Sequence, residues 1–261
     1  MDKTSIIGLI LGLIAVGIGM VLKGVGLEAL INPAAILIIL LGTAAAVTIA
    51  FPGSALKKIP ALFKIIFTES KQANTKEIIE MFSDWADQTR KEGILSLEQQ
   101  ISEVDDLFLS SGLQLAIDGQ SPDFIKDIML EKIEAMEQRH EEGAAIFTQA
   151  GTYAPTLGVL GAVIGLIAAL GDMSDIDALG AAISAAFIAT LLGIFTGYVL
   201  WHPFANKLRE KSKREVLQKE IIVEGILSIT TGDSRLIVQE KLGSLLPSKE
   251  IASIKEGYTN E

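Results

Sequence analysis

The sequence predicts an all-α polytopic membrane protein. Four transmembrane helices are expected, with a large helical cytoplasmic domain between the second and third and a cytoplasmic helix after the fourth. The 261-residue chain is 49% hydrophobic, and its mean hydropathy is +0.44. Its apolar residues gather in four blocks of about membrane length, from which charged residues are almost absent. Between the second and third blocks lies a charged region with amphipathic helical periodicity.

The first two blocks form a predicted hairpin with a short loop. The first span covers roughly residues 5–22, after a short polar lead. Such a start also occurs in secretory signals, but this run is longer than a typical signal core and another span follows at once, so we expect an uncleaved helix. The second span begins at Asn32-Pro33, where proline suits a first helical turn, and ends at Pro52-Gly53.

The charged region carries signals for helix starts and for one break. Residues 74–77, Asn-Thr-Lys-Glu, resemble a capping box, and Ser121-Pro122 reads as an N-cap followed by a helix-favouring proline. Arg90 and Glu98 bracket an apolar stretch in which Gly93 indicates a break between helices. Taken alone, these two charges are most simply solvent-exposed helix ends.

The last two blocks, residues 152–170 and 178–200, form a second predicted hairpin. The turn between them contains Asp172, Asp175 and Asp177. Small residues recur along both spans at helical spacing, which lets helices approach closely in lipid, where packing drives association. We therefore expect this hairpin to face other helices.

A proline lies at each outer end of the second hairpin, Pro155 near its entry and Pro203 just past its exit. Because an antiparallel hairpin returns its ends to the same membrane face, we expect the two prolines at one depth. Each removes a backbone N–H donor and loosens its helix.

These features divide the chain into four parts. Residues 1–53 hold transmembrane helices one and two, residues 54–150 the cytoplasmic domain, residues 151–206 helices three and four, and residues 207–261 a cytoplasmic helix and tail. We expect the tail to be helical to about residue 227 and then polar and loosely patterned.

Basic residues set the expected orientation. They follow the second and fourth spans, whereas the turn between spans three and four has only aspartates. The basic residues are Lys57, Lys58 and Lys64 after the second span, and Lys207, Arg209, Lys211, Lys213 and Arg214 after the fourth. By the positive-inside rule both termini are cytoplasmic; Lys23 argues mildly the other way.

Composition disfavours several functions. A net charge of -10 makes nucleic acid an unfavourable partner and suits a basic protein partner. There is no cysteine, and His140 and His202 do not have metal-ligand spacing. No nucleophile or phosphate-binding motif is present, so we predict no enzyme activity, catalytic residue, cofactor or metal site.

An ion path through a membrane usually needs an ionisable group, and none lies within the four spans. Any such carboxylate must come from a partner. The polar residues in the spans are hydroxyls, whose simplest role is bonding to helix carbonyls or between helices. They are Thr43, Thr48, Thr190 and Thr196. Thr190 is the best candidate for lining an ion path, and Tyr198 and Trp201 have the placement of an interfacial aromatic belt.

Three segments, in this order and spacing, resemble bacterial flagellar stator subunits of the MotA type. They are RKEGILSLE at 90–98, YAPTLGVLGAVIGL at 153–166 and WHPFANKL at 201–208. The opening MDKTSIIGLILGLIAVGIGMVLKG and the segment NPAAILIILLGT look similar as well, so the resemblance covers nearly the whole chain.

The resemblance implies a cation-driven torque generator embedded in the bacterial inner membrane. Five copies would surround a dimer of a single-span partner, MotB, which carries the ion-binding aspartate and a peptidoglycan-binding domain. Helices three and four would face the partner, with helices one and two outside. The family's functional prolines map onto Pro155 and Pro203, and its charged pair that engages the rotor switch-ring protein, FliG, maps onto Arg90 and Glu98.

The resemblance also bears on the ion. Sodium-driven relatives tend to have a threonine seven residues after the proline of span three, and this position is Ala162 here. A methyl group cannot coordinate sodium, so we predict proton coupling. Thr190 matches a hydroxyl that both ion classes share.

Several alternatives remain open at this point. One is a sodium-driven stator, and another is an energiser of envelope processes of the TolQ or ExbB type. The energisers look three-spanned with an external N-terminus, unlike the topology expected here. A self-sufficient channel or carrier would need an intramembrane charge, and a scaffold without ion coupling would tolerate replacement of both prolines.

Overall fold

The computed structural model describes residues 2–69, 75–101, 104–171 and 176–246, and the elements within these ranges are all helical. The chain divides into two compact units. One comprises Met1–Ser70 and Arg139–Lys211, and the other Lys71–Gln138 and Ser212–Glu261. These two units are defined by contacts within the fold. They differ from the four consecutive parts expected from the sequence, because the helices α8 and α10 each contribute to both units.

The first unit opens with the expected hairpin. Helix α1 (Lys3–Leu22) and helix α2 (Pro33–Ala50) are joined through the short 3-10 helix η1 (Leu27–Leu30). The Asp2 carboxylate caps α1 by accepting from the Ser5 N–H, and the Asn32 side chain caps α2 by accepting from the Ala35 N–H at 3.1 Å. Both helices are long and apolar enough to cross a membrane.

A cluster of five aromatic rings packs where α4 meets the second hairpin. Helix α3 (Gly53–Leu56) leads into α4 (Ile59–Phe67), which is amphipathic. The aromatic cluster consists of Phe63, Phe67, Phe147, Trp201 and Phe204. Trp201 lies within 6.2 Å of Phe147 and of Phe204, centroid to centroid. Trp201 is half-buried in this cluster and Tyr198 is 65% exposed, and their placement in an interfacial belt stays a prediction.

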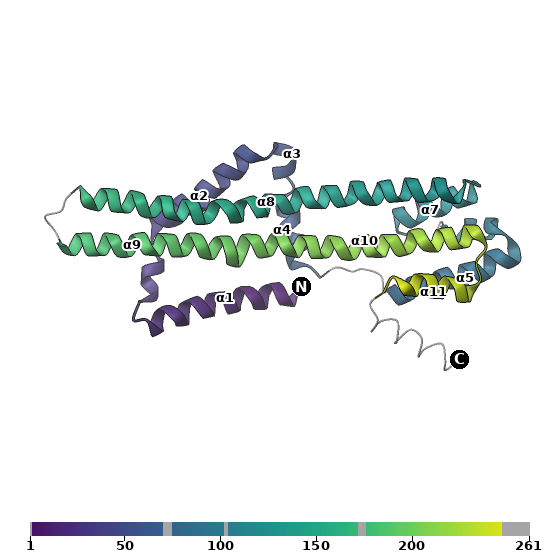
Figure 1. The fold of residues 1–261 in the computed structure, drawn as a ribbon, viewed down its shortest axis with the longest axis horizontal. Helices are drawn as coiled ribbons and strands as arrows, with labels where there is room; N and C mark the ends of the chain where they lie inside the picture. Colours follow the sequence, from purple (N-terminus) through teal and green to yellow (C-terminus); the bar gives the residue numbers. More distant parts are fainter. Residues whose placement is uncertain (1, 70–74, 102–103, 172–175, 247–261) are drawn as a thin grey trace. The chain divides into compact units, whose positions relative to one another are not determined.

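The second hairpin consists of helices much longer than its spans (Figure 1). Helix α8 (Pro122–Leu170) has 49 residues and includes the third span. Helix α9 (Ile176–Phe195), the π-helix η3 (Thr196–Trp201) and α10 (His202–Thr231) follow without a gap. The expected domain limit at residue 150 falls inside α8, because no proline interrupts that helix before Pro155.

The N-cap expected at the start of α8 is present. Ser121 caps the helix, and its hydroxyl accepts from the Phe124 N–H at 3.3 Å. Asp172 and Asp175 lie outside the described residues, and Asp177 is exposed in the first turn of α9.

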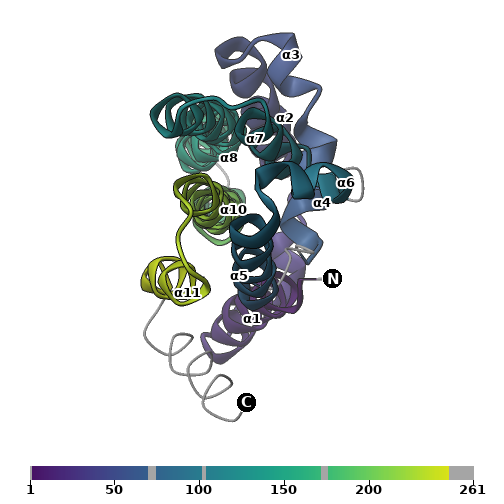
Figure 2. The same ribbon diagram turned by 90° about the vertical axis from the view of Figure 1, so that its right-hand side faces the viewer.

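The second unit packs short helices around the ends of α8 and α10 (Figure 2). These are α5 (Thr75–Glu92), the 3-10 helix η2 (Ile94–Leu97), α6 (Glu98–Ile101), α7 (Leu107–Ile117) and α11 (Arg235–Ser244). Helix α5 is described from Thr75, and Asn74, the first residue of the expected capping box, lies outside the described residues. The largest fully buried side chains of the second unit include Phe82, Leu113, Met129, Ile222 and Ile226.

The polar, loosely patterned tail expected after residue 227 is wrong for residues 228–246, and residues 247–261 lie outside the described residues. Helix α10 continues to Thr231 and ends at Gly232, whose φ of 75° few other residues adopt. Helix α11 then packs against α5, and its Val238 and Leu242 are buried. Few apolar residues mark this helix, so its periodicity is weak in the sequence.

Candidate functional site

Helices α8 and α9 touch through their backbones at two glycines. A Cβ placed on Gly158 would lie 2.8 Å from the Ala189 carbonyl oxygen, and one on Gly193 would lie 2.8 Å from the Ala154 carbonyl oxygen. Each glycine therefore presents its Cα hydrogens to a carbonyl of the other helix, a weak contact that is typical of closely packed helices. The small residues expected to allow close packing do so within one chain.

The same helix interface continues at Pro155, which lies about one turn from Gly158 along α8. A Cβ on Gly197 would lie 2.7 Å from Cγ of Pro155 and 2.8 Å from the Gly151 carbonyl oxygen. Pro155 lacks the N–H that would bond to the Gly151 carbonyl in a regular helix. That carbonyl instead faces the Cα hydrogens of Gly197, which belongs to the π-helix η3.

Pro203 explains why η3 adopts π geometry. The N–H of His202 donates to the Gly197 carbonyl, five residues earlier, and Pro203 itself has no N–H to give. A wider turn is a known response to a lost donor and often occurs at functional sites. No expectation from the sequence covered this segment, although Pro203 directly after a long apolar run was the available signal.

The two prolines are close in depth but not level. Pro155 lies opposite Gly197, whereas Gly151 lies opposite His202, since a Cβ on Gly151 would meet the His202 ring at 2.8 Å. Four residues along a helix correspond to about 6 Å, so Pro203 is offset from Pro155 by about one turn. Pro203 is exposed and Pro155 half-buried.

Ala162 and Thr190 lie on the same helix pair, on the opposite side of the Gly158–Gly193 contact from the prolines. Ala162 is buried in a cluster of alanines with Ala35 of α2 and with Ala186 and Ala189 of α9. Thr190 is half-buried, and its hydroxyl donates to the Ala186 carbonyl at 3.1 Å, the simple role expected for it. A hydroxyl held in this way can still accept a hydrogen bond.

The other hydroxyls in the spans behave in two ways. Thr48 donates to the Ala44 carbonyl and Thr196 to the Leu192 carbonyl, at 2.7 and 2.9 Å. Thr43 is buried, and its hydroxyl has no partner among the described residues. Within those residues, no group of three or more histidine, cysteine or acidic side chains is placed to hold a metal ion.

Arg90 and Glu98 belong to the second unit, on either side of a tight bend. Helix α5 ends at Glu92, Gly93 takes a φ of 83°, and α6 begins at Glu98. The break expected at Gly93 is confirmed. Both charged side chains are exposed, and neither forms an ion pair with any residue in the described ranges.

Comparisons with known proteins extend over nearly the whole chain. Residues 100–221 match the MotA/TolQ/ExbB proton channel family. Motility protein A of Bacillus subtilis (strain 168) is 62% identical over 250 residues, covering 96% of this chain and 93% of that protein. The chain belongs to the MotA/TolQ/ExbB proton channel family.

Two solved structures of the family share the fold. The flagellar MotAB stator complex from Bacillus subtilis matches with a TM-score of 0.92 at 62% identity, covering 97% of this chain and 99% of that one. MotAB of C. jejuni matches with a TM-score of 0.90 at 30% identity, covering 95% and 97%. Together with the four long apolar helices, the match makes this chain a multi-pass inner-membrane protein of the MotA/TolQ/ExbB family.

A polar anchor that the sequence analysis missed ties the start of this family member to its second hairpin. The Asp2 N–H donates to the Phe67 carbonyl at 2.9 Å, and the Asp2 carboxylate pairs with Lys207 at 2.8 Å and Lys211 at 3.5 Å. Lys211 also donates to the Thr68 carbonyl at 2.6 Å, at the end of α4. Burial by itself raises the pKa of Asp2, but the hydrogen bond and charge of Lys207 outweigh it and hold this pKa well below its usual range.

A second polar contact joins the two long helices beyond the prolines. Arg209 of α10 binds the Glu141 carboxylate of α8 with two nitrogens, at 2.6 and 2.8 Å, and donates to the Thr148 hydroxyl at 3.0 Å. A bidentate guanidinium–carboxylate pair fixes orientation as well as distance. The glycine contact and this ion pair therefore hold the pair of helices on both sides of Pro203.

Proposed function

We propose that this chain is a flagellar motor stator subunit. With the single-span partner MotB it forms a proton channel and converts the proton motive force into torque on the rotor switch ring. The observation that carries the proposal is the match of nearly the whole chain to the Bacillus subtilis MotAB stator complex, at 62% identity and a TM-score of 0.92. The absence of ionisable residues from the four spans agrees with a channel whose carboxylate comes from the partner.

The subunit works as a homo-oligomer, a pentamer around a partner dimer. Much of the apolar surface of its spans is exposed in the single chain, for example at Leu41, Ile49, Ile167 and Phe187. Such surface requires lipid or other helices to cover it. The α8–α9 pair lines the inside of the ring, and α1 and α2 lie outside.

Proton coupling follows from the residues beside the proposed ion path. Ala162 offers a methyl group where sodium would need an oxygen ligand, and its neighbours Ala186 and Ala189 offer none from their side chains. Thr190 supplies the hydroxyl on this stretch of α9. Protons require hydrogen-bonding groups rather than a coordination shell, and the partner's aspartate with Thr190 meets that requirement.

Both termini and the second unit are cytoplasmic. The Asp2 anchor supports this orientation, because it holds the start of α1 against Lys207 and Lys211 of the basic segment after the fourth span. Arg90 and Glu98, exposed and without ion pairs among the described residues, contact FliG. Single exposed contacts are weak, which suits an interaction that forms and breaks repeatedly.

The two prolines couple ion passage to movement. Pro155 touches Gly197, the Gly197 carbonyl accepts from His202, and Pro203 follows His202. Protonation of a partner carboxylate near Pro155 would shift the packing there, and η3 would pass the shift to α10. Helix α10 leads directly into the second unit, which carries the rotor contacts.

The test is deletion of the gene followed by observation of tethered cells, with flagellar filaments counted in the same culture. We expect normal filaments that no longer turn, and recovery when the gene returns. Cells that swim normally without the gene, in a strain that has no second stator set, would contradict the proposal and favour an envelope energiser.

Returning the gene as Pro155→Ala or Pro203→Ala tests the coupling role. Each substitution restores a backbone donor and lets the helix close regularly, so we expect torque to be abolished while the complex with the partner still assembles. Assembly is measured by co-purification of the partner. Normal swimming of both variants would disprove the coupling role and leave the stator assignment to the deletion experiment.

A further inference from the structure

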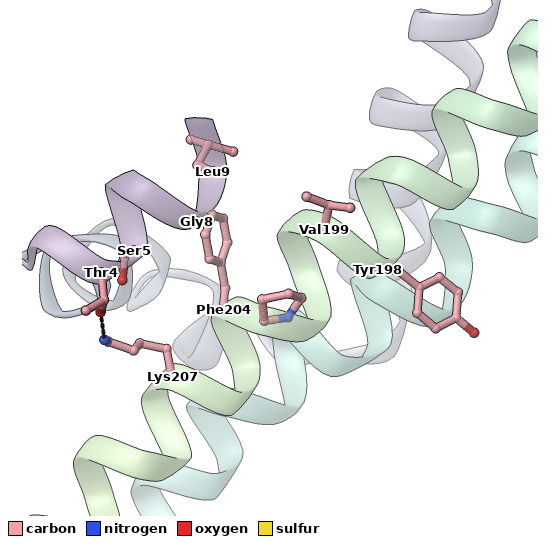
Figure 3. A pocket seen from close by; sticks show the side chains of 9 residues that line it. Thr4, Ser5, Gly8, Leu9, Tyr198, Val199, Phe204 and Lys207 are labelled. Atoms are coloured by element: carbon pink, nitrogen blue, oxygen red, sulfur yellow. Dashed lines mark hydrogen bonds between the residues drawn. The ribbon is translucent and has the colours of Figure 1, made fainter. Parts of the chain in front are cut away.

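A pocket of about 350 Å³ lies between the first turns of α1 and the junction of η3 with α10 (Figure 3). One end of the pocket is apolar, with Gly8 and Leu9 on the α1 side and Val199 and Phe204 on the other. Figure 3 shows the Phe204 ring reaching toward Gly8, while Tyr198 points away from α1. Neither the family match nor the proposed ion path accounts for this space.

The other end of the pocket is polar and basic. The Lys207 ammonium donates to the Thr4 hydroxyl at 2.8 Å and pairs with Asp2 at 2.8 Å. An ammonium has three N–H donors, so one donor of Lys207 has no partner among the described residues. Lys211 shares the Asp2 carboxylate at 3.5 Å. Two cations thus share one carboxylate, which leaves a surplus of positive charge at the polar end.

The pocket runs from the start of α1, a helix long and apolar enough to cross a membrane, along its apolar surface. Thr4 lies in the first turn of the membrane-crossing helix α1, and Leu9 lies more than one turn deeper. A molecule that fills the pocket therefore needs an anionic group at the level of Lys207 and an apolar chain that runs past Leu9 and Val199. Anionic phospholipids combine these two properties and are attracted by lysines near the surface.

We propose that this pocket binds one anionic phospholipid per subunit, from the leaflet at the N-terminal end of α1. The phosphate accepts from the remaining donor of Lys207, and an acyl chain packs on Leu9, Val199 and Phe204. The lipid also touches Pro203, which lines the pocket and is exposed. The proposal rests on the membrane placement of α1 in the proposed function, but not on torque generation.

The experiment uses the complete complex with its partner, purified in detergent. It is exposed to an equimolar mixture of phosphatidylglycerol and phosphatidylcholine with the same acyl chains, and native mass spectrometry counts the lipids retained. We expect about fivefold preference for phosphatidylglycerol. This ratio corresponds to about 1 kcal/mol, the attraction of an anionic lipid surface for one nearby lysine. Equal retention of both lipids would overturn the proposal.

Two variants test the location. In Gly8→Phe the new ring fills the pocket, and it does so without a clash at Cβ, where nothing lies within 4 Å. Gly19→Phe is the matched control, because Gly19 is also exposed on α1 with nothing within 4 Å and does not line the pocket. We expect Gly8→Phe to lose the preferred lipid and Gly19→Phe to keep it.

A third variant, Lys207→Gln, keeps the shape of the pocket and is expected to lower the preference toward equal retention. If Gly8→Phe alone prevents assembly of the ring, a second copy of the chain occupies this face and the proposal is wrong. If phosphatidylglycerol preference survives both Gly8→Phe and Lys207→Gln, the lipid binds elsewhere and the proposal is likewise overturned. The deletion experiment judges the stator role independently of any of these results.

Discussion

Gly197 lies against the ring of Pro155, and its carbonyl accepts from the N–H of His202, the residue before Pro203. No side chain intervenes between the two prolines at this point, so a displacement of one reaches the other through the backbone. Backbone contact at this distance depends on the missing Cβ of Gly197. Gly197 therefore belongs to the proposed coupling site, although it has neither a charge nor a hydroxyl.

Replacement of this glycine should therefore be costly. In Gly197→Ala the new Cβ would meet Pro155 at 2.7 Å and the Gly151 carbonyl at 2.8 Å. We expect stability to fall by about 1–3 kcal/mol, as for other overpacked sites, and torque to fall strongly even where the complex assembles. Tethered-cell rotation and partner co-purification measure the two effects.

Gly180→Ala is the control for this substitution. Gly180 lies in α9, and a Cβ there meets nothing within 4 Å. We expect its torque to be normal. Equal torque in the two variants would show that the contact with Pro155 does not matter for coupling.

At the scale of helices, starts and breaks follow from local chemistry and could be predicted. Ser121 as a cap and Gly93 as a break depend on residues within a few positions, and the structure has both features. The π-helix η3 is different, because it combines a missing donor at Pro203 with a tertiary contact to α8. Helix α11 was missed because its burial depends on α5, which is distant in the sequence.

Asp106 both caps helix α7 and links it to helix α10. Asp106 accepts from the Phe108 N–H at 2.8 Å, and its carboxylate pairs with Lys219 of α10 at 2.8 Å. Burial raises the pKa of Asp106, but the hydrogen bond and charge of Lys219 outweigh it, so this pKa lies below its ordinary value of 3.8. The stabilisation is therefore complete above that value and is lost as the pH falls through the folded-state pKa.

Asp106→Asn keeps the cap and removes the charge. We expect a lower midpoint of thermal unfolding for the purified complex at pH 7, by less than about 1 kcal/mol of stability, since the pair is partly exposed. The difference from the unmodified protein should disappear in acid, below the ordinary pKa of an aspartate. Asp105→Asn, at the exposed neighbour, should match the unmodified protein at every pH, and a difference that persists in acid would contradict the assignment.

At the scale of the whole molecule, the four long apolar helices and the family could be predicted, because both depend on long patterns rather than single contacts. Hairpin geometry predicted the two prolines at one depth, and the structure offsets them by about one turn. The anchor of Asp2 on Lys207 and Lys211 could not be found in this way, because these residues are distant in the sequence and their charges are unremarkable individually. Such contacts depend on the assembled fold.

The proposed rotor contact belongs to this scale, since it would join the chain to another protein assembly. Arg90→Glu reverses an exposed charge at the end of α5 without removing a contact among the described residues. We expect a graded loss of swimming speed, because one exposed charge pair contributes roughly 0.2–1 kcal/mol. Glu98→Lys should have a similar effect. Lys91→Glu is the matched control at the neighbouring exposed position, and an equal loss in that variant would point to net charge rather than to a specific contact.

The two tryptophans of the chain are divided between its two units. Trp85 is buried against Phe82 in one, and Trp201 lies in the aromatic cluster of the other, two residues before Pro203. A Trp85→Phe variant therefore leaves Trp201, at the end of the π-helix η3, as the one tryptophan of this chain. Its emission wavelength would report the hydration of the aromatic cluster, so movement at η3 could be followed optically in the purified protein without attaching a dye.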